Sequence, residues 1–129
     1  MAKSIFIGLD FSINKPAMTI LYDKQFSFYI WPLKMSKKQL DLYNNNGVEA
    51  VSRGLNEISH NQIDSSKMVI EHTRRSIDLA NMIANRIDEF IMENDAYDAA
   101  LYIASEGLSF NSVGSATLDL ATYKGVLLS

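Results

Sequence analysis

The sequence predicts an α/β domain, and three features carry this prediction. Residues 4–31 form an apolar, aromatic-rich stretch broken only by short turn-forming segments, which is typical of consecutive strands. Residues 73–93 repeat apolar side chains at helical spacing, which predicts a long amphipathic helix. Residues 99–104 (AALYIA) then return to a short apolar run. A strand that follows a helix in this way suits a parallel pairing with the first sheet.

The first stretch divides into three predicted strands. Residues 5–9 (IFIGL) contain strand formers and no charged side chain, so we expect the first strand to be buried on both faces. Residues 17–22 (AMTILY) form the second strand, and Asp23-Lys24 connects it to residues 25–31 (QFSFYIW). The alternation in this last run favours a half-exposed antiparallel strand. Together the strands predict an antiparallel meander that ends at Pro32.

The middle of the chain has the weakest pattern. Residues 33–66 mix short helical patches with segments rich in Asn, Gly and Ser. The helical spacing of Val48, Val51, Leu55 and Ile58 predicts a short helix, preceded by an insertion or loop. Residues 67–70 fit either a short strand or the start of the long helix.

The remaining helices are defined by their apolar positions. The long helix has an expected inner face of Ile77, Ala80, Ile83, Ile87, Phe90 and Ile91. A loop over residues 107–114 then leads into a last predicted helix over residues 115–128.

Composition limits the class of protein. At 129 residues, with 47% hydrophobic and 21% charged residues, the chain is expected to form a single domain with a core of its own. No apolar run approaches the roughly 18–20 residues of a membrane span, and the start of the chain lacks a signal-peptide pattern. We therefore expect a cytoplasmic protein with no membrane partner. The absence of cysteine excludes disulfides, thiolate metal sites and cysteine nucleophiles. The net charge of −3 argues mildly against a nucleic-acid partner, although carboxylates that hold metal ions contribute to that charge.

Two carboxylates follow predicted strands. Asp10 ends the first strand, and Glu106 follows the strand over residues 99–104. If the two strands are parallel neighbours, these side chains come close together. They would repel one another unless one is protonated or a cation lies between them. Two alternatives stay open: Asp10 as a turn or capping residue, and Glu106 as a loop carboxylate paired with Lys15 or Arg74.

Two segments resemble a known family. The opening GLDFSINKPAMTIL resembles the first strand, turn and second strand of the ribonuclease H-like superfamily, whose first strand ends in a metal-binding aspartate. The segment LYIASEGLSFNSVGSATLDLATYKGVLL resembles the second motif of the RuvC-like Holliday junction resolvases. In that motif a strand ends in a catalytic glutamate, a loop with an aromatic residue and an asparagine follows, and a helix begins with Ser-Ala and ends near a glycine. The matching positions are Glu106, Phe110, Asn111, Ser115, Ala116 and Gly125.

The resemblance implies a ribonuclease H-like fold, with a three-strand antiparallel meander, a parallel strand and flanking helices. It also implies a Mg²⁺- or Mn²⁺-dependent endonuclease that cleaves phosphodiester bonds of branched DNA. Two divalent ions about 4 Å apart would activate a water and stabilise the leaving oxygen, with Asp10 and Glu106 as catalytic, metal-binding residues. Family members act as dimers, so a homodimer is expected, in the cytoplasm of a bacterial host if a phage encodes the chain. The residues expected to contact nucleic acid are Phe110, Asn111, Lys124, Arg74 and Arg75.

The chain departs from the family at its C-terminal end. RuvC-like nucleases complete their site with further acidic residues, or a histidine and an aspartate, on a later helix, and the sequence ends at Ser129 without one. A truncated protein, or a nuclease-derived module that binds nucleic acid or protein without cutting, is therefore an open alternative. A fragment of an actin-like ATPase is a third interpretation, although no second phosphate loop is found. Purely structural roles also stay open for these residues. Phe110 can be a packing residue, and a solvated face can be formed by Arg74, Arg75, Arg86 and the basic cluster Lys34, Lys37 and Lys38.

Overall fold

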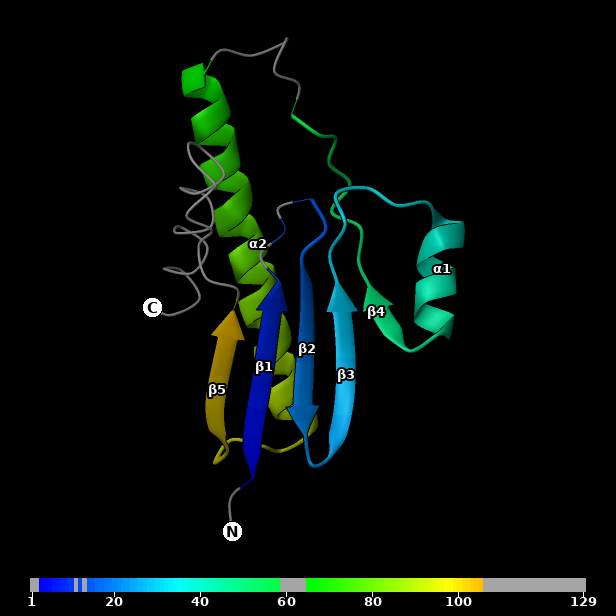
Figure 1. The fold of residues 1–129 in the computed structure, drawn as a ribbon, viewed down its shortest axis with the longest axis vertical. Coiled ribbons are helices and arrows are strands. Elements are labelled where there is room, and N and C mark those ends of the chain that lie inside the picture. Colours follow the sequence, from blue (N-terminus) through cyan, green and yellow to red (C-terminus); the bar gives the residue numbers. More distant parts are fainter. Residues whose placement is uncertain (1–2, 11, 13, 59–64, 106–129) are drawn as a thin grey trace. The chain divides into compact units, whose positions relative to one another are not determined.

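The described backbone has an α/β architecture built around a five-stranded mixed sheet (Figure 1). This computed structural model of the chain describes residues 3–10, 12, 14–58 and 65–105. The chain separates into two units, of which one holds the sheet with a short helix and the other holds a long helix. Within the described ranges, no helix combines the length and the apolar character needed to cross a membrane.

The strands of the sheet lie in the order β4-β3-β2-β1-β5. β1, β2 and β3 pair antiparallel, which confirms the predicted meander, although β3 ends at Ile30 rather than at Trp31. β5 pairs parallel with β1, as the sequence predicts, and β4 pairs parallel with β3. The strand bounds are Ser4–Asp10 (β1), Ala17–Tyr22 (β2), Gln25–Ile30 (β3), Val48–Ala50 (β4) and Ala100–Ser105 (β5).

The hairpin between β2 and β3 turns on Asp23 and Lys24. Their φ angles are 50° and 65°, so both central residues of this two-residue loop are left-handed. Such turns match the right-handed twist of the flanking strands, which is why they are favoured in hairpins. The Lys3 ammonium lies 3.0 Å from the Asp23 carboxylate and links the start of β1 to this turn.

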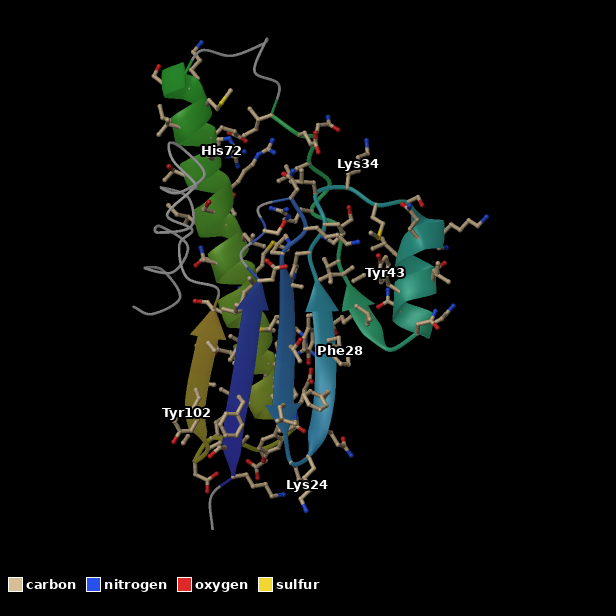
Figure 2. The ribbon with its side chains drawn as sticks, in the orientation of Figure 1. Lys24, Phe28, Lys34, Tyr43, His72 and Tyr102 are labelled. Atoms are coloured by element: carbon tan, nitrogen blue, oxygen red, sulfur yellow. The ribbon has the colours of Figure 1, made fainter. Side chains whose placement is uncertain are left out.

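The two faces of the sheet differ, and the prediction that β1 is buried on both faces is wrong. Ile5, Ile7 and Leu9 are buried, whereas Phe6 is 49% exposed. Successive side chains of a strand point to opposite faces, so the buried and exposed residues of β1 simply alternate. On the exposed face, the Phe6 ring stacks on Tyr102 of β5 with 5.3 Å between centroids. Figure 2 shows Tyr102 on β5 and Phe28 on β3.

The predicted helix over residues 48–58 is also wrong. Residues 48–50 form β4, and residues 51–58 contain no helix. Backbone amides of Val51, Arg53 and Leu55 donate to carbonyls of Ile30, Pro32 and Leu33. These bonds continue the extended pairing beyond β4, and they satisfy backbone groups that would otherwise lack partners. The pairing outweighs the helical spacing of the side chains.

Helix α1 (Lys37–Asn45) occupies the region where the sequence predicts an insertion or loop. Its N-terminus has a capping box: the Gln39 amide donates to the Ser36 hydroxyl, and the Ser36 amide donates to the Gln39 side chain, both at 3.3 Å. This reciprocal arrangement satisfies two backbone donors that a helix start leaves free. At the other end of α1 the chain turns through Gly47, with φ at 83°, into β4.

Helix α2 (Ser65–Glu93) starts earlier than residue 73 and settles the ambiguous residues 67–70 as helical. Its buried stripe includes Ala80, Ile83, Ile87 and Phe90, as expected. Leu79 is also buried, whereas Ile77 is exposed, contrary to the expected inner face. Ser76 is buried and continues the stripe toward the N-terminus at a three- to four-residue interval, so Ile77 lies beside the stripe rather than on it.

The hairpin turn predicts a stabilising substitution. Lys24→Gly is expected to raise the free energy of unfolding by about 1 kcal/mol, because a left-handed backbone costs a residue with a Cβ more than it costs glycine. Urea denaturation followed by circular dichroism measures the change. Lys38→Gly inside α1 is the matched control and should lower stability by about 1 kcal/mol. A lower urea midpoint for Lys24→Gly would contradict the prediction.

Candidate functional site

A depression of about 400 Å³ lies at the C-terminal ends of β1 and β5. Both strands and the neighbouring β2 belong to the same unit, so their relative placement is defined. Asp10 provides the only charged side chain among its lining residues. These are Gly8, Leu9, Asp10, Ala17, Thr19, Ala104 and Ser105.

The depression exists because the side chains above this part of the sheet are small. Gly8 pairs with Thr19 on β2 and with Ala104 on β5, all on the exposed face. A Cβ atom added at Gly8 would meet no other atom within 4 Å, so the space above the strand is open. Glycine inside a strand often marks a place where a ligand or another backbone approaches closely.

Asp10 is exposed, and its carboxylate shapes the turn that follows β1. The Ser12 amide donates to Asp10 Oδ1 at 3.1 Å, and the Lys15 amide donates to the Ser12 hydroxyl at 3.4 Å. The alternative that Asp10 is a turn residue is therefore confirmed. Asp10 lies on the exposed face of the sheet, so its carboxylate stays hydrated and does not require a cation beside it.

The strand pairing brings together the two residues that precede the candidate carboxylates in the sequence. The last residue pair of the parallel ladder joins Leu9 to Ser105, the residues that directly precede Asp10 and Glu106 in the sequence. Glu106 itself lies outside the described residues, as do Phe110, Asn111 and Lys124. Within the described part of the chain, no group of three or more His, Asp or Glu side chains is placed to hold a metal ion.

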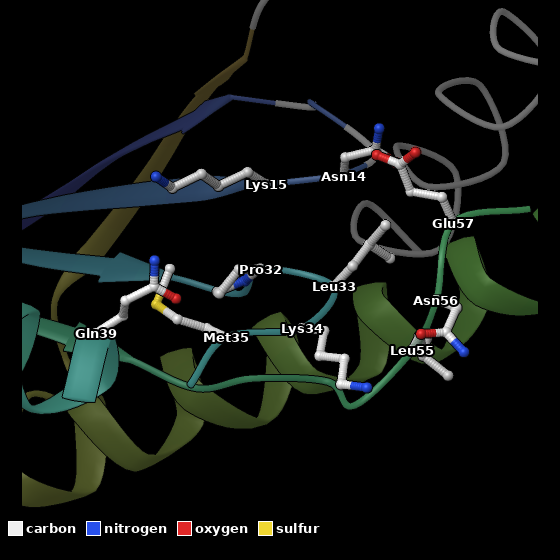
Figure 3. A pocket seen from close by; sticks show the side chains of 10 residues that line it. All are labelled: Asn14, Lys15, Pro32, Leu33, Lys34, Met35, Gln39, Leu55, Asn56 and Glu57. Carbon is white, nitrogen blue, oxygen red and sulfur yellow. The ribbon is translucent and has the colours of Figure 1, made fainter. Parts of the chain in front are cut away.

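A second hollow, of about 360 Å³, lies between the turn after β1 and the start of α1 (Figure 3). Lys15 and Lys34 both line it, but Figure 3 shows their side chains pointing in different directions. The Lys15 ammonium donates to the Tyr43 hydroxyl at 2.8 Å and lies 5.0 Å from the centre of its ring. The two cations therefore do not converge on one anion. Lys34, Lys37 and Lys38 are all exposed, in line with a solvated basic face.

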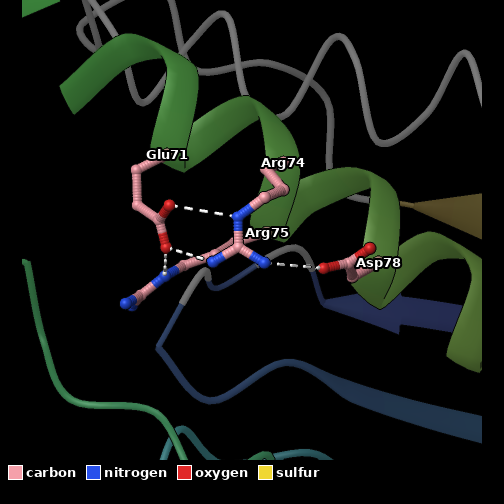
Figure 4. A network of polar contacts seen from close by, with 4 residues as sticks. All are labelled: Glu71, Arg74, Arg75 and Asp78. Atoms are coloured by element: carbon pink, nitrogen blue, oxygen red, sulfur yellow. Dashed lines mark hydrogen bonds and ion pairs between the residues drawn. The ribbon is translucent and has the colours of Figure 1, made fainter. Parts of the chain in front are cut away.

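Arg74 and Arg75 lie on α2 within a cluster of acidic side chains (Figure 4). Arg74 donates to Glu71 through Nε at 3.1 Å and contacts Asp78 at 3.3 Å. Arg75 Nε donates to Glu71 at 2.8 Å. Hydrogen bonds from Arg74 and then Arg75 lower the pKa of Glu71 to about 2 from 4.5.

This cluster changes the interpretation of the two arginines as nucleic-acid contacts. Two arginine charges are balanced by the carboxylates of Glu71 and Asp78, which reduces the local field available to a phosphate. Arg74 remains 55% exposed, as a solvated face requires. The side chain of Arg75 is only 13% exposed and that of Arg86 only 15%, so the solvated-face interpretation is wrong for both.

Sequence reasoning missed most of the depression. Asp10 was found because a carboxylate ended a strand, but Thr19, Ala17 and Ala104 are ordinary strand residues with no distinguishing pattern. Gly8 carried a usable signal, since glycine is unfavourable inside a strand unless space or close approach is needed there. The other lining residues follow only from the register of β1 with its two neighbours.

The Glu71 cluster predicts a pH dependence of stability. Because the folded-state pKa is lowered from 4.5 to about 2, this carboxylate stabilises the fold fully above pH 4.5 and progressively less as pH falls toward 2. Glu71→Gln should lower the free energy of unfolding near neutral pH by less than about 1 kcal/mol, since the cluster is partly exposed. It should also make the loss of stability below pH 4.5 less steep. Urea midpoints between pH 2.5 and 7 test this. Glu89→Gln, on the same helix, should lose stability below pH 4.5 as steeply as the parent chain. The prediction would be contradicted if both variants showed the same weakened dependence of the urea midpoint on pH.

Comparison of the chain with models of protein families, with curated proteins and with solved structures finds no match. The ribonuclease H-like and RuvC-like assignment therefore stays a prediction from the two sequence segments, and the functional argument depends on the geometry of the sheet.

Proposed function

We propose that this chain is the core of a ribonuclease H-like, RuvC-like endonuclease that uses Mg²⁺ or Mn²⁺ to cleave phosphodiester bonds of branched DNA. One observation carries the proposal: the parallel ladder of β1 and β5 ends with the pair Leu9 and Ser105, and each of these residues is followed in the sequence by a carboxylate. These carboxylates are Asp10 and Glu106. Carboxylates are the oxygen donors that a divalent metal site requires.

The directions of the strands support the same proposal. An antiparallel meander with a parallel strand beside β1 is the arrangement that the resemblance implies, and the chain has both in one sheet. Many unrelated functions share α/β sheets, so this agreement adds weight only together with the carboxylate positions.

The donors at the depression fit a hard cation. The Asp10 carboxylate and the hydroxyl-bearing residues Thr19 and Ser105 line the same space, and oxygen ligands are those that Mg²⁺ prefers. Ser12 engages one carboxylate oxygen of Asp10 and thereby orients the group. When bound, the metal would supply an activated water and stabilisation of the charge on the phosphate. The chain contributes the orientation of Asp10 and, through Gly8 and Ala104, the open space in which a phosphate can approach it.

A second candidate function is a nuclease-derived module that binds branched DNA without cleaving it. One observation favours it: no group of three or more His, Asp or Glu side chains is placed to hold a metal ion among residues 3–10, 12, 14–58 and 65–105. The two functions differ in whether Asp10 matters for turnover, so a substitution there separates them.

Asp10→Asn is expected to lower cleavage of a four-way DNA junction in Mg²⁺ or Mn²⁺ by at least about 100-fold, because it removes a charge that acts at the reacting phosphate. Gel assays with labelled junctions measure cleavage and binding separately. Asp23→Asn, at the opposite end of the sheet, is the control and should cleave normally. Junction binding without cleavage, unchanged by Asp10→Asn, would support the binding module and overturn the nuclease.

Gly8→Val provides a second test that leaves every carboxylate in place. The added side chain meets no atom near its Cβ, and valine favours strands, so thermal stability should hold or rise. The same side chain fills the depression beside Asp10, so cleavage should fall by about tenfold or more while the protein stays folded. Gln25→Val, at an exposed position of β3 that does not line the depression, is the comparison and should cleave normally. Full cleavage activity in Gly8→Val would place the reaction elsewhere.

A further inference from the structure

Asn46 caps the C-terminal end of helix α1 with its side chain. Its Nδ2 donates to the Leu42 carbonyl at 2.6 Å, and its backbone amide donates to the Tyr43 carbonyl at 3.0 Å. The last four carbonyls of a helix have no partner within the helix, so the Asn46 side chain supplies a donor that Leu42 would otherwise lack. The cap therefore depends on an amide NH2 group, which a carboxylate cannot replace because it has no hydrogen to donate.

Gly47 directly follows this cap and has no side chain to shield it. Its φ is 83°, the left-handed conformation in which glycine commonly ends a helix. Asn46 and Gly47 are both exposed, and a Cβ atom added at Gly47 would meet no other atom within 4 Å. The Gly47 amide donates to the Asn44 carbonyl at 3.3 Å, which is long for a hydrogen bond. Water and the Gly47 nitrogen can therefore reach the Asn46 side chain once this turn opens.

We propose that the Asn46–Gly47 junction is a site of spontaneous deamidation that releases the last turn of α1. The Gly47 nitrogen gives up its proton and attacks the Asn46 Cγ atom. A bond forms between these two atoms, the bond from Cγ to Nδ2 breaks, and Nδ2 leaves with a proton as ammonia. Water then opens the five-membered imide at either carbonyl, which leaves aspartate or isoaspartate at this position. Asparagine is counted among the thermolabile residues.

Two neighbouring asparagines provide an internal comparison. Asn44 and Asn45 are each followed by another asparagine, whose side chain hinders the attacking nitrogen, whereas Gly47 has no Cβ. The amide group of Asn44 is also held at both of its ends. It donates to the Leu40 carbonyl at 2.8 Å and accepts from a backbone amide of β4 at 3.3 Å. Asn46 is therefore the position that reacts first.

The folded turn slows this reaction without preventing it. The bond to Leu42 turns the Asn46 side chain back along the helix. The Gly47 nitrogen is meanwhile engaged with the Asn44 carbonyl, so both reacting groups must be freed before they can meet. Helix ends fray at little cost in free energy. The rate of deamidation therefore follows how often the last turn of α1 opens.

Deamidation loosens more than the end of the helix. The new carboxylate cannot donate to Leu42, and it adds a negative charge at the negative end of the α1 dipole. Tyr43 lies in the same turn (Figure 2), and its hydroxyl accepts a hydrogen bond from the Lys15 ammonium at 2.8 Å. Opening of the turn thus releases Lys15, which belongs to the segment between β1 and β2. The inference does not depend on the proposed nuclease function.

Incubation of the full chain at mildly alkaline pH, followed by proteolysis and tandem mass spectrometry, tests the site. We expect Asn46 to deamidate at least about tenfold faster than Asn44 or Asn45, because only Asn46 precedes a residue without a Cβ. In guanidinium chloride, where the cap is lost, the rate at Asn46 should rise by about threefold or more. Equal rates at the three asparagines, or no conversion of Asn46, would overturn the site. A rate that denaturation leaves unchanged would overturn the role of the cap.

Lysine labelling with an amine-reactive ester tests the release of the turn. Asn46→Asp reproduces one product, and Asn45→Asp is the matched control, since it adds the same charge while both capping amides stay in place. Labelling of Lys15 should be about twofold or more faster in Asn46→Asp than in the parent chain, because its hydrogen bond to Tyr43 is weakened. Lys24, in the hairpin at the opposite end of the sheet, is the reference site. Circular dichroism checks that both variants fold. An equal rise in Asn45→Asp, or no rise in Asn46→Asp, would overturn the release.

Discussion

The parallel pairing of β1 with β5 is the contact on which the rest of the sheet unit depends. β1, β2 and β3 follow one another through short turns, so their pairing is local. β5 joins them only after the chain has passed through both helices, and the entropy of closing so long a loop must be offset by the ladder from Ser4–Ala100 to Leu9–Ser105. That ladder decides which residues share the C-terminal edge of the sheet. The depression beside Asp10 is one consequence.

Register and burial support each other in β1. Ile5, Ile7 and Leu9 point to the buried face, and full burial of an aliphatic side chain of this size contributes about 1.5–3 kcal/mol. A slip of one residue would exchange the faces and expose all three, so the apolar residues hold the register firmly. The same alternation places Gly8 and Asp10 on the accessible face. The candidate site is thus positioned by residues that take no part in it.

The surroundings of a charge, more than its position in the sequence, determine what it can do. Asp10 is exposed and hydrogen-bonded to the Ser12 amide, so its presence has a structural explanation, and the functional case depends on the neighbouring strand end and the open space. Arg74 shows the opposite situation. It is an accessible cation, but Glu71 and Asp78 hold it, so its attraction for a phosphate is reduced. Accessibility alone therefore identifies neither a metal ligand nor a nucleic-acid contact.

The features that depend on near neighbours along the chain could be predicted from the amino-acid sequence: the meander, the long helix and the strand after it. Helix α1 could also have been predicted, because Ser36 and Gln39 have the residue types and spacing of a capping box in the sequence. Two other features depend on contacts between distant parts of the chain. Residues 48–58 have helical spacing, yet backbone bonds to residues 30–33 hold the segment extended at least as far as Leu55. The exposure of Phe6 and Asp10 likewise depends on which face of the sheet is covered. Side-chain spacing describes a segment in isolation, whereas pairing and burial depend on residues far away in the sequence.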